Sequence, residues 1–169
     1  MNADESHILL QITILLRRKM IHRLRRIQLV STPLEEIWSY FSTPKNLNTM
    51  TPPHMQFEII YGDDERMFQG QLIEYRVQLM PMVTSRWLTE ITHVQEQVSF
   101  VDEQRIGPYR FWHHTHHFDA IEGGTRITDQ ITYALPFEPF GDLVHHVWVR
   151  KQLKQIFDFR REKLQELFT

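Results

Sequence analysis

The chain has 169 residues, a formal net charge of −2 and no cysteine. This length suits one domain that buries a substantial hydrophobic core. The absence of cysteine excludes disulfide bonds and thiolate metal ligands, and it suits a reducing compartment, so we expect a cytoplasmic protein. Beyond one short N-terminal run the basic residues are scattered, which argues against nucleic acid as a partner.

Residues 1–20, MNADESHILLQITILLRRKM, contain a short apolar run. This run is shorter than the roughly 20 apolar residues that cross a bilayer, so we expect no integral membrane segment. Acidic residues precede the run and basic residues follow it, which is the reverse of a secretory signal. We therefore expect an extension at 1–20 outside a domain at 21–169. Weak contact of the basic run with a membrane surface is the alternative.

The first part of the domain alternates between strand and helix signals. The run HRLRRIQLV (22–30) predicts a strand. The sequence STPLEEIWSYFS (31–42) predicts a short helix, because Thr32 and Glu35 have the spacing of a capping box. A second short helix is expected at PKNLNTM (44–50), before two prolines that end it.

The rest of the domain predicts strands and one long helix. Six strand-like runs lie at 55–61, 70–80, 83–94, 96–104, 110–121 and 125–135. The breaks between them are too short for crossover helices, so the strands should pair antiparallel. Residues 141–168 predict a helix whose apolar stripe changes face near 148–151. We expect a bend there, with residues 137–147 forming a lid.

This order of elements resembles a known superfamily. The segments STPLEEIWSYFSTPKNLNTMTPP, FVDEQRIGPY followed by FWHHTHHF, and FDFRREKLQEL are similar to those of bacterial ligand-binding SRPBCC proteins, relatives of the START and Bet v 1 families. The resemblance covers about residues 22–168 and implies an α+β helix-grip fold. In this fold a curved antiparallel sheet of six or seven strands wraps around the long C-terminal helix and encloses an apolar cavity. The ligand is left open, because the superfamily includes lipid carriers, polyketide cyclases, hydrolases and chaperone activators.

The stretch FWHHTHHF (111–118) places four histidines on one expected strand. Because side chains alternate along a strand, His114 and His116 share one face, and His113 and His117 share the other. The face of His114 is mostly apolar or aromatic along this strand and its neighbours, so it should look into the cavity. The other two histidines should lie on the outer surface.

The sequence EGGT (122–125) joins the last two strands. With its two glycines as the turn, it would place Phe118 opposite Asp129 and His116 opposite Ile131. The inner face then supplies the predicted ligand-binding residues, namely Tyr75, Trp87, Thr89, Phe100, Asp102, Trp112, His114, His116, Asp129 and Tyr133, with Ile156 from the long helix. Plain core packing is the alternative for the aromatic members of this set.

The polar residues His114, His116, Asp102 and Asp129 permit four interpretations, the first being that they line the pocket and orient a polar group of the ligand. A structural pair between His116 and Asp129 would satisfy a buried carboxylate. A catalytic group made of His114, His116 and Asp129 would transfer protons. A divalent metal could bind the same side chains, but H-x-H is a weak motif, so we expect neither a metal nor another cofactor.

These observations predict a protein that binds one small hydrophobic molecule, lipid-, isoprenoid- or polyketide-like, beside a polar His/Asp patch. Two alternatives stay open. The first is an acid/base enzyme of the cyclase or hydrolase type that uses His114, His116 and Asp129. The second is a protein-interaction module whose cavity is incidental.

Overall fold

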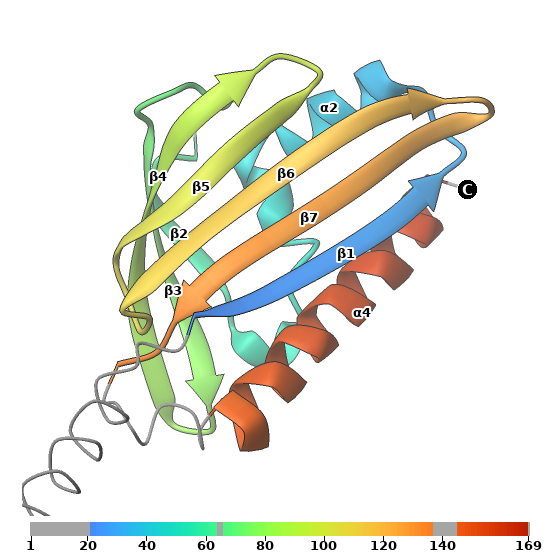
Figure 1. Ribbon diagram of the computed structural model, residues 1–169. Helices are drawn as coiled ribbons and strands as arrows, with labels where there is room; N and C mark the ends of the chain where they lie inside the picture. Colours follow the sequence, from blue (N-terminus) through green and yellow to red (C-terminus); the bar gives the residue numbers. More distant parts are fainter. Residues whose placement is uncertain (1–20, 64–65, 137–144, 169) are drawn as a thin grey trace, which may run out of the picture.

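A computed structural model describes residues 21–63, 66–136 and 145–168 (Figure 1). The predicted extension at 1–20 and most of the predicted lid at 137–147 lie outside the described residues. In chain order the elements are β1 (His22–Val30), α2 (Leu34–Phe41), η1 (Pro44–Leu47), η2 (Pro53–Met55), β2 (Glu58–Tyr61), β3 (Leu72–Met80), β4 (Val83–Gln95), β5 (Ser99–Ile106), β6 (Phe111–Ile121), β7 (Gly124–Ala134), η3 (His145–Val149) and α4 (Arg150–Leu167).

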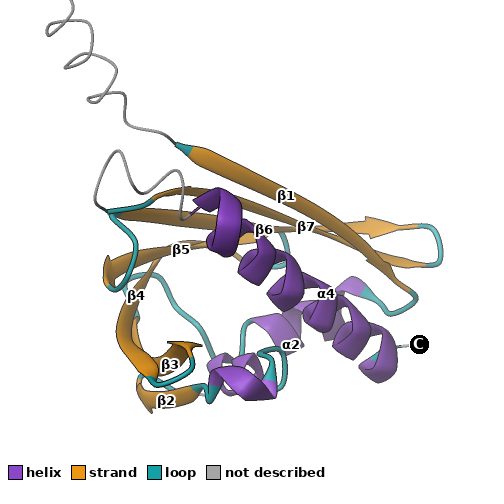
Figure 2. Cartoon of the chain, turned by 90° about the horizontal axis from the view of Figure 1, so that it is seen from below, coloured by secondary structure: helices purple, strands orange, loops and turns teal. Residues whose placement is uncertain are grey.

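The strands form one seven-stranded sheet in the order β1-β7-β6-β5-β4-β3-β2. Every neighbouring pair is antiparallel. The sheet curves around α4, and α2 lies on the same concave side (Figure 2). This is the predicted α+β helix-grip arrangement. Among the described residues, no helix has the length and apolar character needed to span a membrane.

The two short helices after β1 differ in detail from the sequence prediction. Thr32 does not cap α2, because its hydroxyl donates a hydrogen bond of 3.0 Å to the backbone oxygen of Phe168. The capping-box prediction is therefore wrong, and Thr32 instead joins the end of β1 to the C-terminal end of α4. The second predicted helix is a single 3₁₀ turn at Pro44–Leu47.

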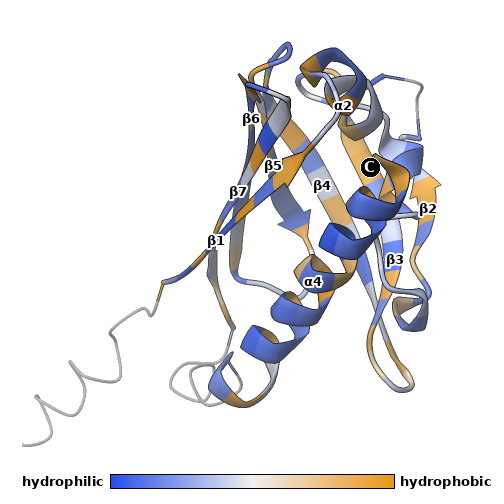
Figure 3. Cartoon of the chain, turned by 90° about the vertical axis from the view of Figure 1, so that its right-hand side faces the viewer, coloured by the Kyte–Doolittle hydropathy of each residue, from blue (hydrophilic) through white to orange (hydrophobic). Residues whose placement is uncertain are grey.

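Helix α4 is attached to the sheet near both of its ends. The Gln152 amide donates to the backbone oxygen of Leu79 at 2.8 Å, close to the start of the helix. The Gln28 amide donates to the backbone oxygen of Arg161 at 3.0 Å, near its end. The helix buries a stripe at i, i+4, i+7 and i+11 that consists of Leu153, Phe157, Arg160 and Leu164. The side of α4 seen in Figure 3 is mostly hydrophilic.

The expected break in the long helix coincides with a change of helix type. Residues His145–Val149 form a π-helical segment directly before α4 begins at Arg150. A π-helical turn contains more residues than an α-helical turn, so it rotates the faces of the helix on either side. The earlier part of the apolar stripe, at residues 140–144, lies outside the described residues. Val147, in the π-helical segment, is 69% exposed, whereas Val149 is buried.

The hairpin between β6 and β7 has a different register from the one expected. Ile121 pairs with Gly124, so the turn consists of Glu122 and Gly123. Gly123 has a φ of +80°, a conformation that favours glycine. Relative to the predicted register, each residue of β6 pairs with the residue two positions earlier in β7. The predicted register is wrong, but the predicted faces hold, because a shift of two leaves each side chain on its own side of the sheet.

A bulge in β4 changes one further assignment. The alternation of the sequence places His93 on the inner face together with Ile91. The pairing of β4 with β5 shifts between these two residues, and His93 is exposed. Val94 takes the inner position and packs against buried hydrophobic residues. The extra residue of a bulge reverses the alternation beyond it, so a simple period-two pattern fails at this point.

Two clusters of buried side chains fill the space between the sheet and the helices. The first lies on the side of the β3–β4 hairpin and contains Met55, Val77, Trp87, Trp112, Ile131, Tyr133, Leu135, Val149, Leu153 and Phe157. The second lies below α2 and contains Val30, Ile37, Trp38, Phe41, Met50, Phe100, Phe118, Ile127 and Leu164. The functional candidates lie where these two clusters meet.

We predict that a chain shortened to begin at Met20 folds. The first strand starts at His22, and the described hydrophobic core begins at Val30. The melting temperature, followed by circular dichroism, should fall by less than about 8 °C relative to the full chain, the scale of a couple of kcal/mol for a domain of this size. Loss of soluble expression, or a larger fall, would show that residues 1–20 stabilise the domain.

Candidate functional site

An internal cavity of about 170 Å³ lies between the concave face of the sheet and α4. Most of the residues that the sequence predicts for ligand binding line this cavity. They are Tyr75, Trp87, Thr89, Phe100, Asp102, Trp112, His114, His116 and Ile156. The other two do not line it: Asp129 lies beyond the histidines on β7, and the hydroxyl of Tyr133 is hydrogen-bonded to Nδ1 of His145 at 3.1 Å.

Sequence reasoning missed several residues of the wall. Gln152 and Arg160 reach the cavity from α4, beside Leu153 and Phe157. The spacing of 153, 157 and 160 is helical, so this pattern could have revealed the buried arginine. The turns after α2 contribute Leu47, Met50, Met55 and Phe57. These segments have no regular periodicity, and the sequence therefore gives no signal for their side-chain directions.

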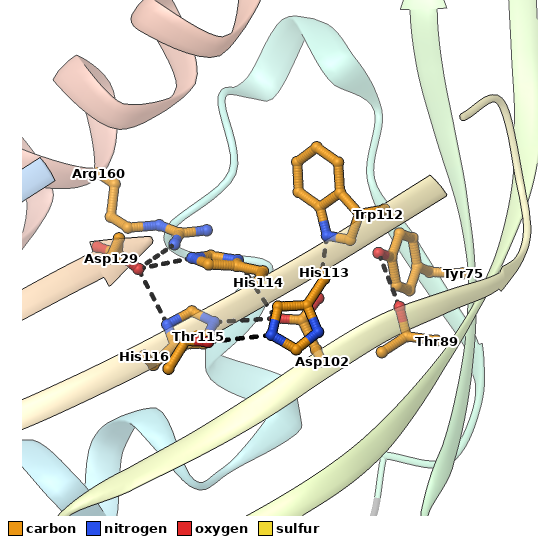
Figure 4. A network of polar contacts seen from close by, with 10 residues as sticks. All are labelled: Tyr75, Thr89, Asp102, Trp112, His113, His114, Thr115, His116, Asp129 and Arg160. Carbon is orange, nitrogen blue, oxygen red and sulfur yellow. Dashed lines mark hydrogen bonds and ion pairs between the residues drawn. The ribbon is translucent and has the colours of Figure 1, made fainter. Parts of the chain in front are cut away.

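Four side chains form a closed polar network on the inner face (Figure 4). His114 places Nε2 2.9 Å from Oδ1 of Asp129 and Nδ1 3.2 Å from Oδ2 of Asp102. His116 places Nε2 3.0 Å from Oδ2 of Asp102 and Nδ1 3.0 Å from Oδ1 of Asp129. The last of these contacts lacks hydrogen-bond geometry. Each imidazole therefore lies between the same two carboxylates.

The register of three strands brings these residues together. Asp102 on β5 lies opposite His114 on β6, and His116 on β6 lies opposite Asp129 on β7. Each carboxylate also reaches the other histidine diagonally, because residues two apart on a strand point to the same face. The two imidazole ring centroids are 3.8 Å apart. His116 lies against Asp129 as predicted, but its hydrogen bond goes to Asp102, and the histidine that is hydrogen-bonded to Asp129 is His114.

Two further donors approach the carboxylates. The indole Nε1 of Trp112 donates to Oδ1 of Asp102 at 3.2 Å. The guanidinium Nη1 of Arg160 lies 3.9 Å from Oδ1 of Asp129, an ion pair without a hydrogen bond. Asp102 thus accepts hydrogen bonds through both of its oxygens. Arg160, by contrast, makes an ion pair with Asp129 but no hydrogen bond to it.

The network shifts the proton equilibria of its members. Burial alone would lower the pKa of His114, but the charge of Asp102 and the hydrogen bonds to Asp102 and Asp129 outweigh it and raise the pKa to about 9. Burial alone would raise the pKa of Asp102 and of Asp129, yet the neighbouring histidines hold both pKa values well below the ordinary range. At neutral pH the network therefore contains an imidazolium between two carboxylates.

Asp102, His114 and His116 are also the residues that could hold a metal ion. Each offers one ligand atom, and these atoms lie within 4.8 Å of one another. A metal would have to displace the proton that the raised pKa of His114 retains. The proton and the metal therefore compete for the same nitrogens.

We predict no stoichiometric metal in protein purified without chelator. The measurement is elemental analysis, repeated after incubation with zinc and desalting at pH 7. One equivalent of metal that is lost in the double variant His114→Ala, His116→Ala would contradict this expectation and make the network a metal site.

We predict that stability decreases as the pH rises from 6.5 to 9. The folded pKa of His114, about 9, lies above its ordinary value of 6.5, so its stabilising protonation is complete below pH 6.5 and is lost as the pH approaches 9. The loss should be on the order of 3 kcal/mol, measured by urea denaturation.

The same series on variants assigns the effect to the network. His114→Gln should reduce the pH dependence, whereas His117→Gln should retain it, because His117 lies on the outer face and its side chain is 41% exposed. If the free energy of unfolding of the wild type does not change between pH 6.5 and 9, His114 is not protonated at neutral pH and the prediction is wrong.

Comparisons with known proteins identify the fold. No family model and no curated protein match the sequence. The structure is similar to that of Ara h 8.0201, with a TM-score of 0.61, 18% identity and coverage of 86% of this chain and 98% of that one. For protein Ms6760 from Mycobacterium smegmatis the TM-score is 0.64 and the identity 20%, with coverage of 86% and 89%. For norcoclaurine synthase from Thalictrum the TM-score is 0.59 and the identity 13%, and the match covers 86% of this chain and 95% of that one. The chain therefore has the helix-grip fold of Bet v 1-like proteins.

Proposed function

We propose that the protein binds one small, largely apolar molecule in the cavity between α4 and the sheet. The observation that carries this proposal is the cavity itself, which has a volume of about 170 Å³, a largely apolar wall and a partly open mouth. Protein interiors are close-packed, and side chains that face an unfilled space lose contacts and therefore free energy. A molecule that fills the space would recover part of this free energy.

The wall of the cavity favours a flat or short molecule. Tyr75 stacks on Trp87 with ring centroids 5.7 Å apart, and Trp112 meets Trp87 edge-to-face at 5.2 Å. Such surfaces pack well against a ring. An apolar cavity of about 150 Å³ in another protein holds benzene. Within the lipid-, isoprenoid- or polyketide-like class, the volume therefore favours a single ring or a short chain.

The same geometry gives less support to an acid/base enzyme. A general base must present a titratable atom to the substrate at hydrogen-bond distance. Both ring nitrogens of His114 and of His116 face the carboxylates of Asp102 and Asp129 instead. The network satisfies its own buried charges, so its arrangement is that of a structural wall beside a bound molecule.

We predict that the protein binds one equivalent of toluene and releases it unchanged. Ile156 lines the cavity from α4, so the larger side chain in Ile156→Trp should occupy the space and weaken toluene binding at least tenfold. Isothermal titration calorimetry gives the stoichiometry and the affinity, and chromatography of the recovered toluene tests for turnover.

Gln155→Trp is the matched control, because Gln155 is the exposed neighbour of Ile156 on the same helix. This variant should bind toluene as the wild type does. Failure of the wild-type protein to bind toluene saturably, or equal binding by Ile156→Trp, would contradict the proposal and favour the interaction module with an incidental cavity. Conversion of the probe would instead favour an enzyme.

A further inference from the structure

Arg160 is a buried arginine that makes an ion pair with the network but no hydrogen bond to it through Nε or Nη1. It lines the cavity from α4 and is 8% exposed. Its guanidinium lies over the ring of Phe157, 5.0 Å from the centroid, and beside His114 and Asp129 (Figure 4). Within the part of the chain that the structure describes, Nε and Nη1 of this guanidinium have no hydrogen-bond partner.

Asp129 does not act as that partner in this arrangement. Its Oδ1 already accepts a hydrogen bond from Nε2 of His114 at 2.9 Å and faces Nδ1 of His116 at 3.0 Å. The guanidinium stays at 3.9 Å from the same oxygen. A buried donor without an acceptor costs about 1–3 kcal/mol, and more when it is charged. The arginine therefore has hydrogen-bonding capacity that the described residues leave unused.

The other polar groups on this wall are mostly paired with one another. The hydroxyl of Tyr75 lies 3.3 Å from that of Thr89, and Gln152 donates to the backbone of β3. Apart from His116 Nδ1, which faces Asp129, the buried nitrogens of cavity-lining residues without a partner belong to Arg160 and to the indole of Trp87. These groups are N–H donors. A molecule that complements them must supply acceptors.

We infer that the molecule bound in the cavity is a small aromatic or alicyclic carboxylic acid, with its carboxylate on Arg160 and its ring against Trp87 and Trp112. A guanidinium presents parallel N–H groups that match the two oxygens of a carboxylate, and the pair is stronger than a neutral hydrogen bond. This inference rests on the proposed function and specifies its ligand class.

The test compares three probes of one size class by calorimetry at pH 7. Phenylacetate carries the acid, phenylacetamide is its uncharged counterpart of nearly the same shape, and toluene has no polar group. The wild-type protein should bind phenylacetate at least tenfold more tightly than phenylacetamide. Arg160→Met should bring the two affinities within twofold of each other while toluene binding is kept, and Arg160→Lys should retain part of the preference.

Arg161→Met is the matched control, since it removes the same charge from the same helix at a side chain that is 55% exposed and paired with Asp158. It should keep the full preference for phenylacetate. Equal binding of phenylacetate and phenylacetamide by the wild type, or an undiminished preference in Arg160→Met, would overturn the inference and leave the proposed function intact. If Arg160→Met does not fold, the wild-type comparison and Arg160→Lys still decide. Absence of binding for all three probes would overturn the proposed function as well.

Discussion

The burial of two carboxylates, Asp102 and Asp129, is the constraint on which the interior depends. An ionised carboxylate taken out of water loses several kcal/mol of hydration, so each needs charged or hydrogen-bonding partners at short range. His114 and His116 supply these partners to both at once, and in doing so they join β5, β6 and β7. The imidazole of His116 stacks on Phe100 of one hydrophobic cluster, with centroids 4.1 Å apart, and His114 lies 6.0 Å from Phe157 of the other. The network thus lies between the two clusters, and residues of both, Phe100 and Phe157 among them, line the cavity.

Helix α4 gives the cavity its opposite wall and brings a positive charge to it. Its attachments near both ends fix the helix along the sheet, so Arg160 is held next to a network that already has its hydrogen bonds. A charged side chain at this position is costly in an apolar interior and gains its full interaction only from a further acceptor. Aromatic rings provide apolar contact and the guanidinium of Arg160 can recognise one polar end of a molecule, the usual division in small-molecule sites.

The faces of the sheet could be predicted from the sequence, whereas its register and part of the site could not. Alternation assigns His114 and His116 to the inner side of the sheet. The error of two residues in the predicted register does not affect this assignment, because a shift of two leaves each side chain on the same face. The conformation of Gly123 decides which residues pair, and the sequence EGGT permits more than one turn. Helical spacing puts Arg160 on the same face as Leu153, Phe157 and Leu164. Its inward position could be predicted only by allowing a charged residue within this apolar stripe. Thr32 follows a helix-capping pattern, yet its hydroxyl bonds to the distant Phe168, a contact that only the tertiary structure creates.

The position of β1 in the sheet has a consequence for the order in which the chain folds. Residues 22–30 are made about a hundred residues before the one strand that pairs with them in the described part of the chain, β7 at residues 125–133. The successive hairpins from β3 to β7 are local in sequence and can form without β1. Closing the long loop between β1 and β7 costs chain entropy before the new contacts compensate for it, so this pairing belongs late on the folding path. During synthesis on the ribosome the first strand therefore stays unpaired, with Leu24 and Val30 uncovered, until β7 has emerged, and an unpaired strand of this kind is prone to aggregation.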